Sequence, residues 1–264
     1  MPSSRNMRAA LTIAGSDSGG GAGIQADLKT FAALGVHGTC AITCLTAQSP
    51  RGILGIQPCS TVILQQQLKA VINDLHPAAA KTGMLYSAAI VRIIAEFLAR
   101  HPIPLVVDPV MISTSGRPLI RPSAVRALCD ELLPLAALVT PNLHEAEVLV
   151  GERLRSPEDL RTAARQLHSR FGCAVLVKGG HLRRGRDAMD IFYDGRQELL
   201  LSAPLVRGVL THGTGCTYSA AVTAYLARGL GMVQAVTKAK GFITKAIAKS
   251  RRVAGHWVLH WEGF

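Results

Sequence analysis

The sequence lacks the features that mark membrane and secreted proteins. No apolar run in its 264 residues is long enough and free enough of charge to span a bilayer. The first six residues contain no apolar core of the kind that a signal peptide needs. We therefore expect a cytoplasmic protein without a membrane partner, and we expect residues 1–6 to be disordered.

Closely paired cysteines are also missing. The chain has six cysteines, none in a C-x-x-C pair, scattered among apolar segments: Cys40, Cys44, Cys59, Cys129, Cys173 and Cys216. This spacing indicates neither a disulfide framework nor a zinc site. A chemical role for cysteine here therefore depends on where a single thiol lies in the fold.

Acidic residues are scarce, above all toward the C-terminus. The formal net charge is +12, and from Ala203 onward Glu262 is the only acidic residue. Such an excess of positive charge favours anionic ligands, of which a polyphosphate is one. No recognised nucleic-acid module and no basic stripe interleaved with aromatics is present, so we expect no nucleic acid as partner.

A lysine is absent where a P-loop would need one. An apolar run, residues 8–15, leads into the glycine-rich segment 16–23, and a helix with the apolar face Ile24, Leu28, Phe31 and Leu34 follows. No Gly-Lys-Ser/Thr closes the segment and its glycines do not follow G-x-G-x-x-G, which excludes Walker and Rossmann sites. Strand, glycine loop and helix instead predict a ligand at the carboxyl end of a strand.

Strand and helix patterns alternate along the rest of the chain. Strands are predicted at 37–47, 53–59, 78–84, 105–107, 137–140 and 174–180, and helices at 64–75, 87–100 and 122–132 and from Ser156 onward. Two antiparallel strands around Gly195 precede two closing helices. No repeat or linker interrupts this order, so we predict one α/β domain over residues 1–264, with a mostly parallel sheet covered on both faces.

The stretch 211–221 is the centre of the functional prediction. Gly213 and Gly215 allow positive φ and a close backbone approach, and a helix begins at this point. The N–H groups of Gly213, Thr214, Gly215 and Cys216 can then converge on an anion. The helix start would also lower the pKa of the Cys216 thiol. A tight loop with an ordinary helix cap is the alternative for this stretch taken alone.

Seven blocks of this sequence resemble those of the hydroxymethylpyrimidine and phosphomethylpyrimidine kinases of thiamine biosynthesis, within the ribokinase superfamily. The blocks are residues 11–30, 45–48, 81–85, 107–111, 140–147, 177–181 and 212–216. The resemblance implies a ribokinase-like three-layer α/β/α fold with a mostly parallel central sheet and a small β flap. It also implies an ATP- and Mg²⁺-dependent kinase that phosphorylates an aminopyrimidine alcohol and then the resulting monophosphate.

The same resemblance implies roles for residues at the phosphate end of the site. Cys216 stands where most sugar kinases of the superfamily have an aspartate base, and residues 213–216 would hold the transferred phosphoryl group. Asn142 and Glu145 match an N-x-x-E element that positions Mg²⁺ and phosphates through water. Lys178 would reach the nucleotide phosphates, and Asp108 would lie beside the metal.

At the other end, Gln48 matches the residue that pairs with the aminopyrimidine ring. A carboxamide offers a donor and an acceptor, which suits a ring nitrogen next to an amino group. Gly15, Asp27 and Met84 would complete this pocket. The resemblance further suggests a homodimer formed through residues 37–59. Separately, the polar segment 109–119 is predicted to be a mobile flap, with an ordinary exposed loop as the alternative.

Two other functions stay open at this point. Pyridoxal or pyridoxine kinases use the same scaffold and the same cysteine on a hydroxymethyl pyridine. A non-catalytic protein that binds anions or nucleic acid would account for the charge of +12, but it would leave Cys216, Lys178 and Glu145 without a role.

Overall fold

The computed structural model describes residues 7–112, 119–180, 182, 187–209 and 212–261. In chain order its strands are β1 (Ala9–Asp17), β2 (His37–Ser49), β3 (Gly52–Pro58), β4 (Ala79–Thr82), β5 (Leu105–Val107), β6 (Leu138–Val139), β7 (Ala174–Lys178), β8 (Asp187–Tyr193), β9 (Glu198–Pro204), β10 (Arg251–Val253) and β11 (His256–Val258). Its α-helices are α1 (Gly23–Ala33), α2 (Thr61–Leu75), α3 (Ala88–Arg100), α4 (Pro122–Ala127), α5 (Leu143–Val150), α6 (Pro157–Phe171), α7 (Thr214–Ala227) and α8 (Met232–Ala248).

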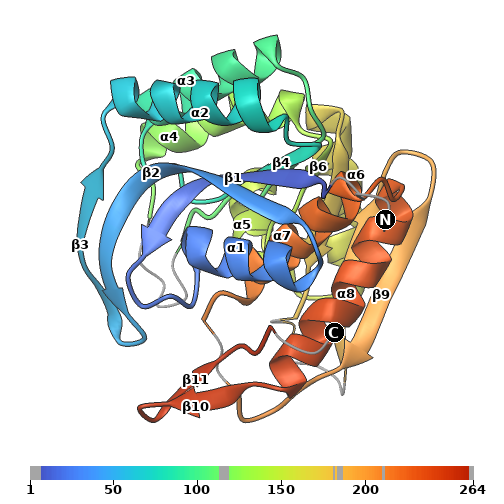
Figure 1. The fold of residues 1–264 in the computed structure, drawn as a ribbon. Coiled ribbons are helices and arrows are strands. Elements are labelled where there is room, and N and C mark those ends of the chain that lie inside the picture. The colour runs from blue at the N-terminus through green and yellow to red at the C-terminus, as the bar shows by residue number, and fades with distance from the viewer. Residues whose placement is uncertain (1–6, 113–118, 181, 183–186, 210–211, 262–264) are drawn as a thin grey trace, which may run out of the picture.

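Within these described residues, nine strands form one sheet in the order β3-β2-β1-β4-β5-β6-β7-β8-β9 (Figure 1). The strands from β2 to β7 run parallel, and β3, β8 and β9 add antiparallel edges. The chain leaves β1 toward β2 on one side and returns to β4 on the other. The strand order therefore reverses between β1 and β4, and in open α/β sheets this point opens a crevice at the carboxyl ends of the strands.

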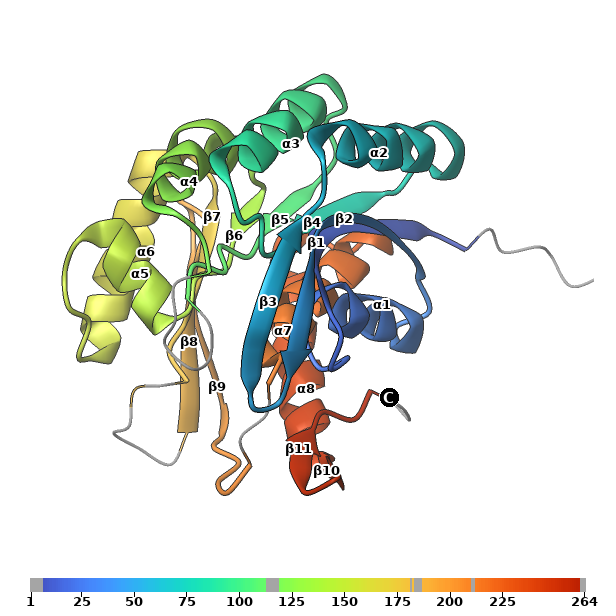
Figure 2. The same cartoon turned by 90° about the vertical axis from the view of Figure 1, so that its left-hand side faces the viewer.

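Two hydrophobic cores lie on opposite faces of the sheet. Leu11 and Ile13 of β1 point toward the core under α2 to α6, whereas Ala10 points toward the core under α1, α7 and α8. This alternation follows from the two-residue period of a strand. Figure 2 shows the resulting layers, with helices on both sides of the sheet. The predicted three-layer arrangement is confirmed.

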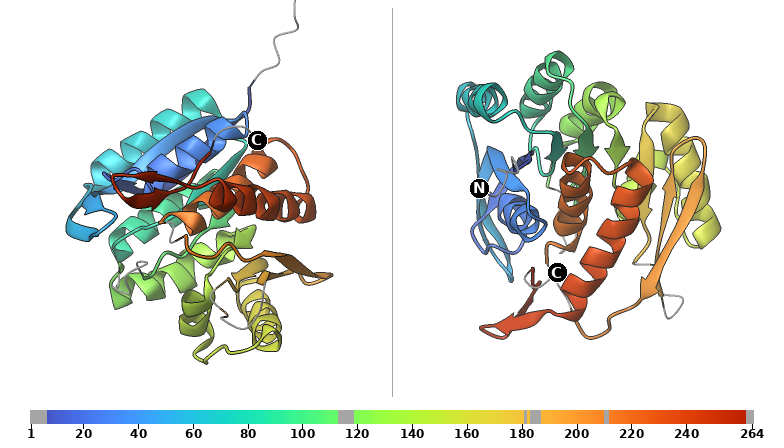
Figure 3. Two further views of the ribbon diagram at one scale, coloured as in Figure 1. Left: turned by 90° about the horizontal axis from the view of Figure 1, so that it is seen from below. Right: turned by 45° about the vertical axis from the view of Figure 1, so that its right-hand side comes forward.

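Helix α7 is the most enclosed helix of its layer. It packs between α1 and α8 and also contacts β1, β4 and β5 (Figure 3). Every residue from Thr217 to Ala224 on it is buried. Because it is held on all sides, the helix fixes the direction in which its N-terminal turn points.

Most predicted elements are present, with differences at their ends. The predicted helix 122–132 is split: α4 stops at Ala127, a π-helical turn η1 (Leu128–Leu132) follows, and a 3-10 turn η2 (Leu133–Leu135) completes it. Strand β2 ends at Ser49, and Gln48 lies at its end as predicted. The antiparallel pair β10 and β11, which forms a small separate sheet, was not predicted.

Two predictions fall wholly or partly outside the described residues. These are the disorder of residues 1–6 and the central part, residues 113–118, of the predicted flap. At the ends of that segment, the Leu119 N–H donates to the Met111 carbonyl over 2.9 Å. In the described part of the chain, no helix has both the length and the apolarity needed to cross a membrane.

Candidate active site

The first glycine loop is held by the carboxylate of Asp17. Asp17 ends β1 and accepts hydrogen bonds from the N–H groups of Gly19 at 2.8 Å, Gly21 at 3.1 Å and Ala22 at 2.8 Å. Burial raises the pKa of Asp17, but hydrogen bonds from His212 and from the backbone outweigh burial and lower it. Asp17 was not among the predicted site residues. An aspartate two residues before a glycine is a signal for such a turn.

Gly15 and Met84, both predicted to line the ring pocket, lie close to each other. A Cβ on Gly15 would lie 2.8 Å from the Cys44 sulfur and 3.5 Å from the Met84 methyl carbon. Gly15 itself stands at an irregularity in the pairing of β1 with β2. The close approach of Cys44 explains why a side chain is not accommodated at position 15.

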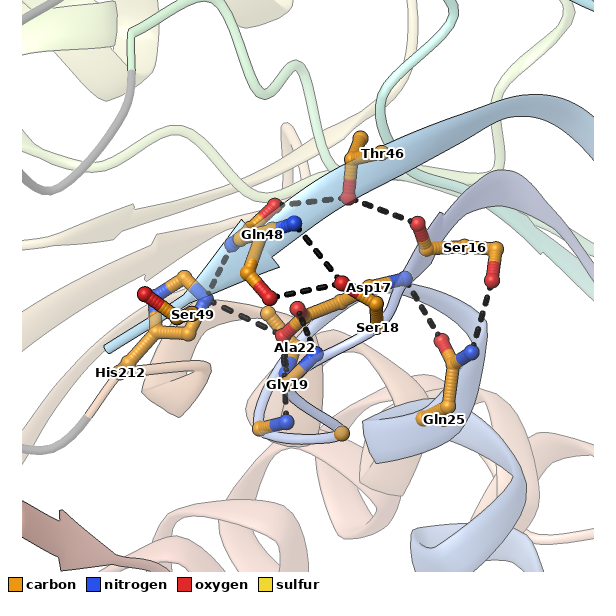
Figure 4. Close-up of polar contacts among 12 residues, drawn as sticks. Ser16, Asp17, Ser18, Gly19, Ala22, Gln25, Thr46, Gln48, Ser49 and His212 are labelled. Atoms are coloured by element: carbon orange, nitrogen blue, oxygen red, sulfur yellow. Dashed lines mark hydrogen bonds and ion pairs between the residues drawn. The ribbon is translucent and has the colours of Figure 1, made fainter. Parts of the chain in front are cut away.

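Gln48 lies at the end of β2, above the first loop (Figure 4). Its backbone exchanges two hydrogen bonds with the Ser18 hydroxyl, at 2.7 and 2.8 Å. Its carboxamide contacts the Thr46 hydroxyl at 3.1 Å and the Nε2 atom of His212 at 2.6 Å. His212, absent from the predicted site, thus joins Gln48 to the stretch that carries Cys216.

Asp27 lies deeper than the ring pocket predicted for it. It is fully buried, and its two oxygens accept from the Lys81 ammonium at 2.7 Å and from the Thr12 hydroxyl at 2.6 Å. Burial raises the pKa of Asp27 and outweighs the opposing effect of Lys81. Both oxygens are therefore engaged beneath the loops, and direct contact of Asp27 with a ring stays a prediction.

Of the two glycines expected to use positive φ in the second loop, Gly213 does so, whereas Gly215 lies within α7 and does not. Gly213 caps α7 with φ of 86°, and no side chain caps the first turn of the helix. A Cβ on Gly213 would collide with the carbonyl oxygen of Gly21, so the two glycine loops pack directly on each other. The N–H groups of Thr214, Gly215 and Cys216 belong to the first turn, whose donors have no partner within a helix.

The charged residues predicted to handle phosphate gather beside Gly215. A Cβ on Gly215 would lie 3.3 Å from the Lys178 Nζ atom and 3.8 Å from an Asp108 oxygen. Lys178 ends β7 and donates to Asp108, which follows β5, over 2.9 Å. Burial raises the pKa of Asp108, but Lys178 and Lys81 outweigh it and keep that pKa low. A bound anion would therefore meet a cation already held in place.

Glu145 and Asn142 form a capping box at the start of α5. The Asn142 side chain accepts from the Glu145 N–H at 3.0 Å, and the Asn142 N–H donates back to Glu145 over 2.9 Å. The other Glu145 oxygen accepts from the Met111 N–H at 3.2 Å. Burial raises the pKa of Glu145 to about 7, against the lowering effect of Lys178. The predicted N-x-x-E element is thus a rigid helix start facing Lys178.

Cys216 corrects one prediction. The start of α7 was expected to lower the pKa of its thiol, but burial raises this pKa to about 12 in the ligand-free protein. Lys81 and an N–H from Gly23 oppose the rise, whereas the carboxylates of Asp27 and Asp108 add to it. Loss of hydration acts on the thiolate from every direction, so it exceeds the effect of one helix terminus.

The residues proposed for Mg²⁺ suit a cation that keeps its water. Among the described residues, no three His, Cys, Asp or Glu side chains group closely enough to hold a metal ion. Asp108 accepts from Lys178, Thr140 and Ser219, and both oxygens of Glu145 accept backbone N–H groups. Mg²⁺ is commonly bound by one or two carboxylates together with substrate phosphates and several waters. The donor set fits that mode.

The C-terminal segment covers the first loop, which the sequence gave no reason to expect. Trp257 and Val258 of β11 line a cavity of about 20 Å³ together with Asp17 and His212. Beyond β11, the Trp261 indole N–H donates to the Thr217 hydroxyl of α7 over 3.3 Å. Aromatic residues this close to the chain end therefore brace both glycine loops.

Comparison with known proteins identifies the family of this chain. Residues 17–260 match the family described as phosphomethylpyrimidine kinase. The chain belongs to that family. A hydroxymethylpyrimidine/phosphomethylpyrimidine kinase of Rhizobium meliloti is 48% identical over 245 residues, which cover 92% of each chain.

Solved structures of similar proteins share the fold as well. The phosphomethylpyrimidine kinase of Clostridium difficile has a TM-score of 0.81 at 41% identity, over 91% of this chain and 99% of that one. A Bacillus subtilis pyridoxal kinase in complex with ADP has a TM-score of 0.89 at 38% identity, over 96% and 97%. The fold is ribokinase-like, as predicted. The kinase at hand thus resembles enzymes named for two different rings.

Proposed function

We propose that the protein transfers the γ-phosphoryl group of ATP to 4-amino-5-hydroxymethyl-2-methylpyrimidine and then to its monophosphate, as a step of thiamine biosynthesis. The observation that carries this proposal is that residues 212–216 contact both the predicted ring-binding residue and the predicted phosphate-binding residues. At one end His212 contacts the carboxamide of Gln48, and at the other end Gly215 lies against Lys178 and Asp108. One short loop thus joins a ring-binding amide to a phosphate-binding cluster.

The residues divide the work of phosphoryl transfer. N–H groups of residues 213–216 stabilise charge on the transferred group, an effect that contributes much of the catalysis in such reactions. Lys178 binds the nucleotide phosphates and positions them beside these N–H groups. Asp108, Glu145 and Asn142 would hold Mg²⁺ through water, and the ion supplies charge neutralisation for the phosphates.

Cys216 takes the proton from the substrate hydroxyl in this proposal. The thiolate is the form that can accept it. Burial raises the pKa of Cys216 to about 12, and Lys81 is the charge that most opposes this rise. Gln48 orients the ring, with Gly15 and Met84 as the wall beneath it. For the second transfer, the phosphate of the monophosphate is the acceptor, and its oxygen needs no base at neutral pH.

A pyridoxal kinase is the second candidate, because a structure with that name aligns over nearly the whole chain. The 48% identity to the Rhizobium meliloti enzyme and the amide of Gln48 favour the pyrimidine. Both substrates could be phosphorylated on one scaffold, so the question is one of relative efficiency.

The proposal is tested by ADP release with purified protein. The pyrimidine alcohol, its monophosphate and pyridoxal are supplied separately, each with Mg²⁺ and again with excess chelator. We expect ADP with both pyrimidines, a lower kcat/KM with pyridoxal, and none with chelator. A higher kcat/KM for pyridoxal would favour the second candidate, and ADP release that no acceptor stimulates would contradict both.

We also propose a homodimer formed through the β2 and β3 edge. β3 is an edge strand, and apolar side chains near it face solvent: Leu45, Leu54, Val62 and Ile63, with Leu54 exposed to 92%. Exposed apolar edge strands commonly pair with another chain. Light scattering should give a dimer for the wild type and a monomer for Leu54→Asp. Val148→Asp, on a distant exposed site, is the control and should stay dimeric.

The compartment follows from the cysteines. All six are free thiols, and such a set is typical of a reducing compartment. We therefore propose that the reaction takes place in the cytoplasm.

A further inference from the structure

His212 makes two polar contacts with the ring side of the site through one atom. Its Nε2 lies 2.6 Å from the Gln48 carboxamide and 3.3 Å from an Asp17 oxygen (Figure 4). Asp17 holds the first glycine loop, and Gln48 is the residue proposed to bind the ring. A single imidazole nitrogen is thus shared between a loop anchor and a substrate-binding group.

The hydroxyl of Thr46 fixes which way the Gln48 carboxamide faces. This hydroxyl has one proton, and the Ser16 carbonyl is its nearer acceptor, at 2.8 Å, compared with 3.1 Å to Gln48. A proton donated to Ser16 leaves the Thr46 oxygen as an acceptor toward Gln48. Figure 4 draws the carboxamide oxygen toward Thr46 and the carboxamide nitrogen toward His212. The single Thr46 proton instead favours the amide turned end for end, with its NH₂ group toward Thr46 and its oxygen toward His212.

The His212 side of the contact leads to the same orientation. A separation of 2.6 Å is slightly shorter than an ordinary N–H···O hydrogen bond. It fits a nitrogen facing another nitrogen less well than a nitrogen facing an oxygen. With the carboxamide oxygen facing it, Nε2 must carry a proton. That proton also points toward the Asp17 carboxylate, whereas a lone pair on Nε2 would face negative charge. A protonated Nε2 that faces the Gln48 oxygen therefore satisfies the contacts of His212 with Gln48 and Asp17 and the contact of Gln48 with Thr46.

We propose that His212 is a specificity-determining positioning residue: its protonated Nε2 locks the Gln48 carboxamide with the oxygen toward His212 and the NH₂ group toward Thr46. This inference rests on the proposed function of Gln48. In the locked state, the carboxamide keeps one oxygen lone pair and one N–H for a ligand. The oxygen can then accept only from an amino group, and the N–H can donate only to the adjacent ring nitrogen, so the ring can bind in a single orientation.

The lock discriminates between rings. An aminopyrimidine that presents its amino group toward the oxygen of Gln48 and its ring nitrogen toward the NH₂ group is matched. A hydroxypyridine without an adjacent donor and acceptor leaves one end of the carboxamide unpaired, which weakens its binding. Without His212 the carboxamide could rotate to suit either ring, so the protein would lose selectivity more than it loses turnover.

The first experiment reads the tautomer of His212 directly. Nitrogen-15 NMR of histidine-labelled wild-type protein should show a proton on Nε2 of His212, with the signal assigned through its loss in His212→Ala. An unprotonated Nε2 would overturn the inference, whatever the enzyme phosphorylates.

The second experiment measures selectivity. For wild type, His212→Ala, His212→Asn and the surface control His144→Ala, KM and kcat are measured for the pyrimidine alcohol, pyridoxal and ATP. We expect His212→Ala to raise the pyrimidine KM about tenfold, to change the pyridoxal KM less, and to leave the KM for ATP unchanged. His212→Asn, which keeps an N–H donor, should restore part of the loss.

The outcomes separate this inference from the proposed function. If the wild type phosphorylates the pyrimidine but His212→Ala leaves the ratio of the two KM values unchanged, the lock is wrong and the function stands. If the wild type phosphorylates no pyrimidine, the function fails, and the NMR result still decides whether the carboxamide is locked.

Discussion

The phosphate end and the ring end of the site are built from different interactions. Beneath the second glycine loop, the pairs Lys81–Asp27 and Lys178–Asp108 are almost wholly buried. Around Gln48, the contacts are hydrogen bonds at the surface, and the His212 side chain is 32% exposed. Buried charges interact strongly and are costly to leave unpaired, whereas contacts near water are weaker and easier to exchange.

This difference suggests a division of tasks within one site. The buried end can stabilise charge because its dipoles and ions are fixed before a substrate arrives. The exposed end can adopt different partners at small cost, which agrees with the similarity of this chain to structures named for a pyrimidine kinase and for a pyridoxal kinase. Changes at the buried end should therefore affect rate and stability, and changes at the exposed end should affect substrate preference.

The largest effect is expected for Cys216→Ser. A serine hydroxyl is a far weaker acid than a thiol and cannot supply a base, so turnover should fall by about 10²–10⁴. Binding of the pyrimidine, measured by calorimetry, should change little. Cys129→Ser, in the turn η1, is the matched control and should keep its activity. Near-normal turnover in Cys216→Ser would make the thiol a packing residue.

Alkylation of Cys216 by iodoacetamide tests the buried environment directly. Since burial raises the pKa of this thiol to about 12, the thiolate fraction at pH 8 should be about 10⁻⁴. The rate of labelling, followed by peptide mass spectrometry, should rise about tenfold per pH unit from 7 to 9 without a plateau. A plateau near neutral pH would restore the prediction of a lowered pKa.

Lys81→Met should destabilise the protein by about 3–5 kcal/mol, because it leaves Asp27 buried without its cation. Urea denaturation measures this, and adding Asp27→Asn should recover much of the loss. Arg92→Met breaks the exposed pair with Glu131 and should cost less than about 1 kcal/mol. Equal costs for Lys81→Met and Arg92→Met would show that burial does not decide how much an ion pair contributes to stability.

A pair of glycines separates backbone strain from crowding. Gly213 and Gly229 both have φ of 86°, but a Cβ would meet Gly21 at the first position and nothing within 4 Å at the second. Gly229→Ala should cost about 1 kcal/mol from strain alone. Gly213→Ala should cost about 2–3 kcal/mol more and should also weaken ATP binding. Similar losses in both would mean that the glycine loops do not need to touch.

The smallest effect belongs to the ring end. Gln48→Ala removes a hydrogen-bonding partner worth roughly 1–3 kcal/mol, so the pyrimidine KM should rise while the KM for ATP stays constant. Steady-state kinetics with each substrate varied in turn shows this. The conservative variant Gln48→Asn tests reach, since it keeps the amide one carbon further back. A rise of equal size in the KM for ATP would place Gln48 outside the ring pocket.

Several parts of this protein could be predicted from its sequence because they depend on local backbone chemistry. The positive φ at Gly213 and the alternation of strands with helices depend on neighbouring residues. The blocks shared with known kinases then placed Lys178, Asp108 and Gly215 in one site, where the structure brings them together. The break in the helix after Ala127 and the hairpin of β10 and β11 were not predicted.

The tertiary structure decided what depends on contacts between distant segments. Gln48 and His212 are 164 positions apart, and no pattern in the chain pairs them. Asp27 looked available to a ligand until the fold enclosed it with Lys81, and Trp261 reached α7 only through the final hairpin. The pKa of Cys216 shows the reason most clearly. A helix start is visible in a sequence, but the loss of hydration that overrides it is a property of everything packed around the thiol.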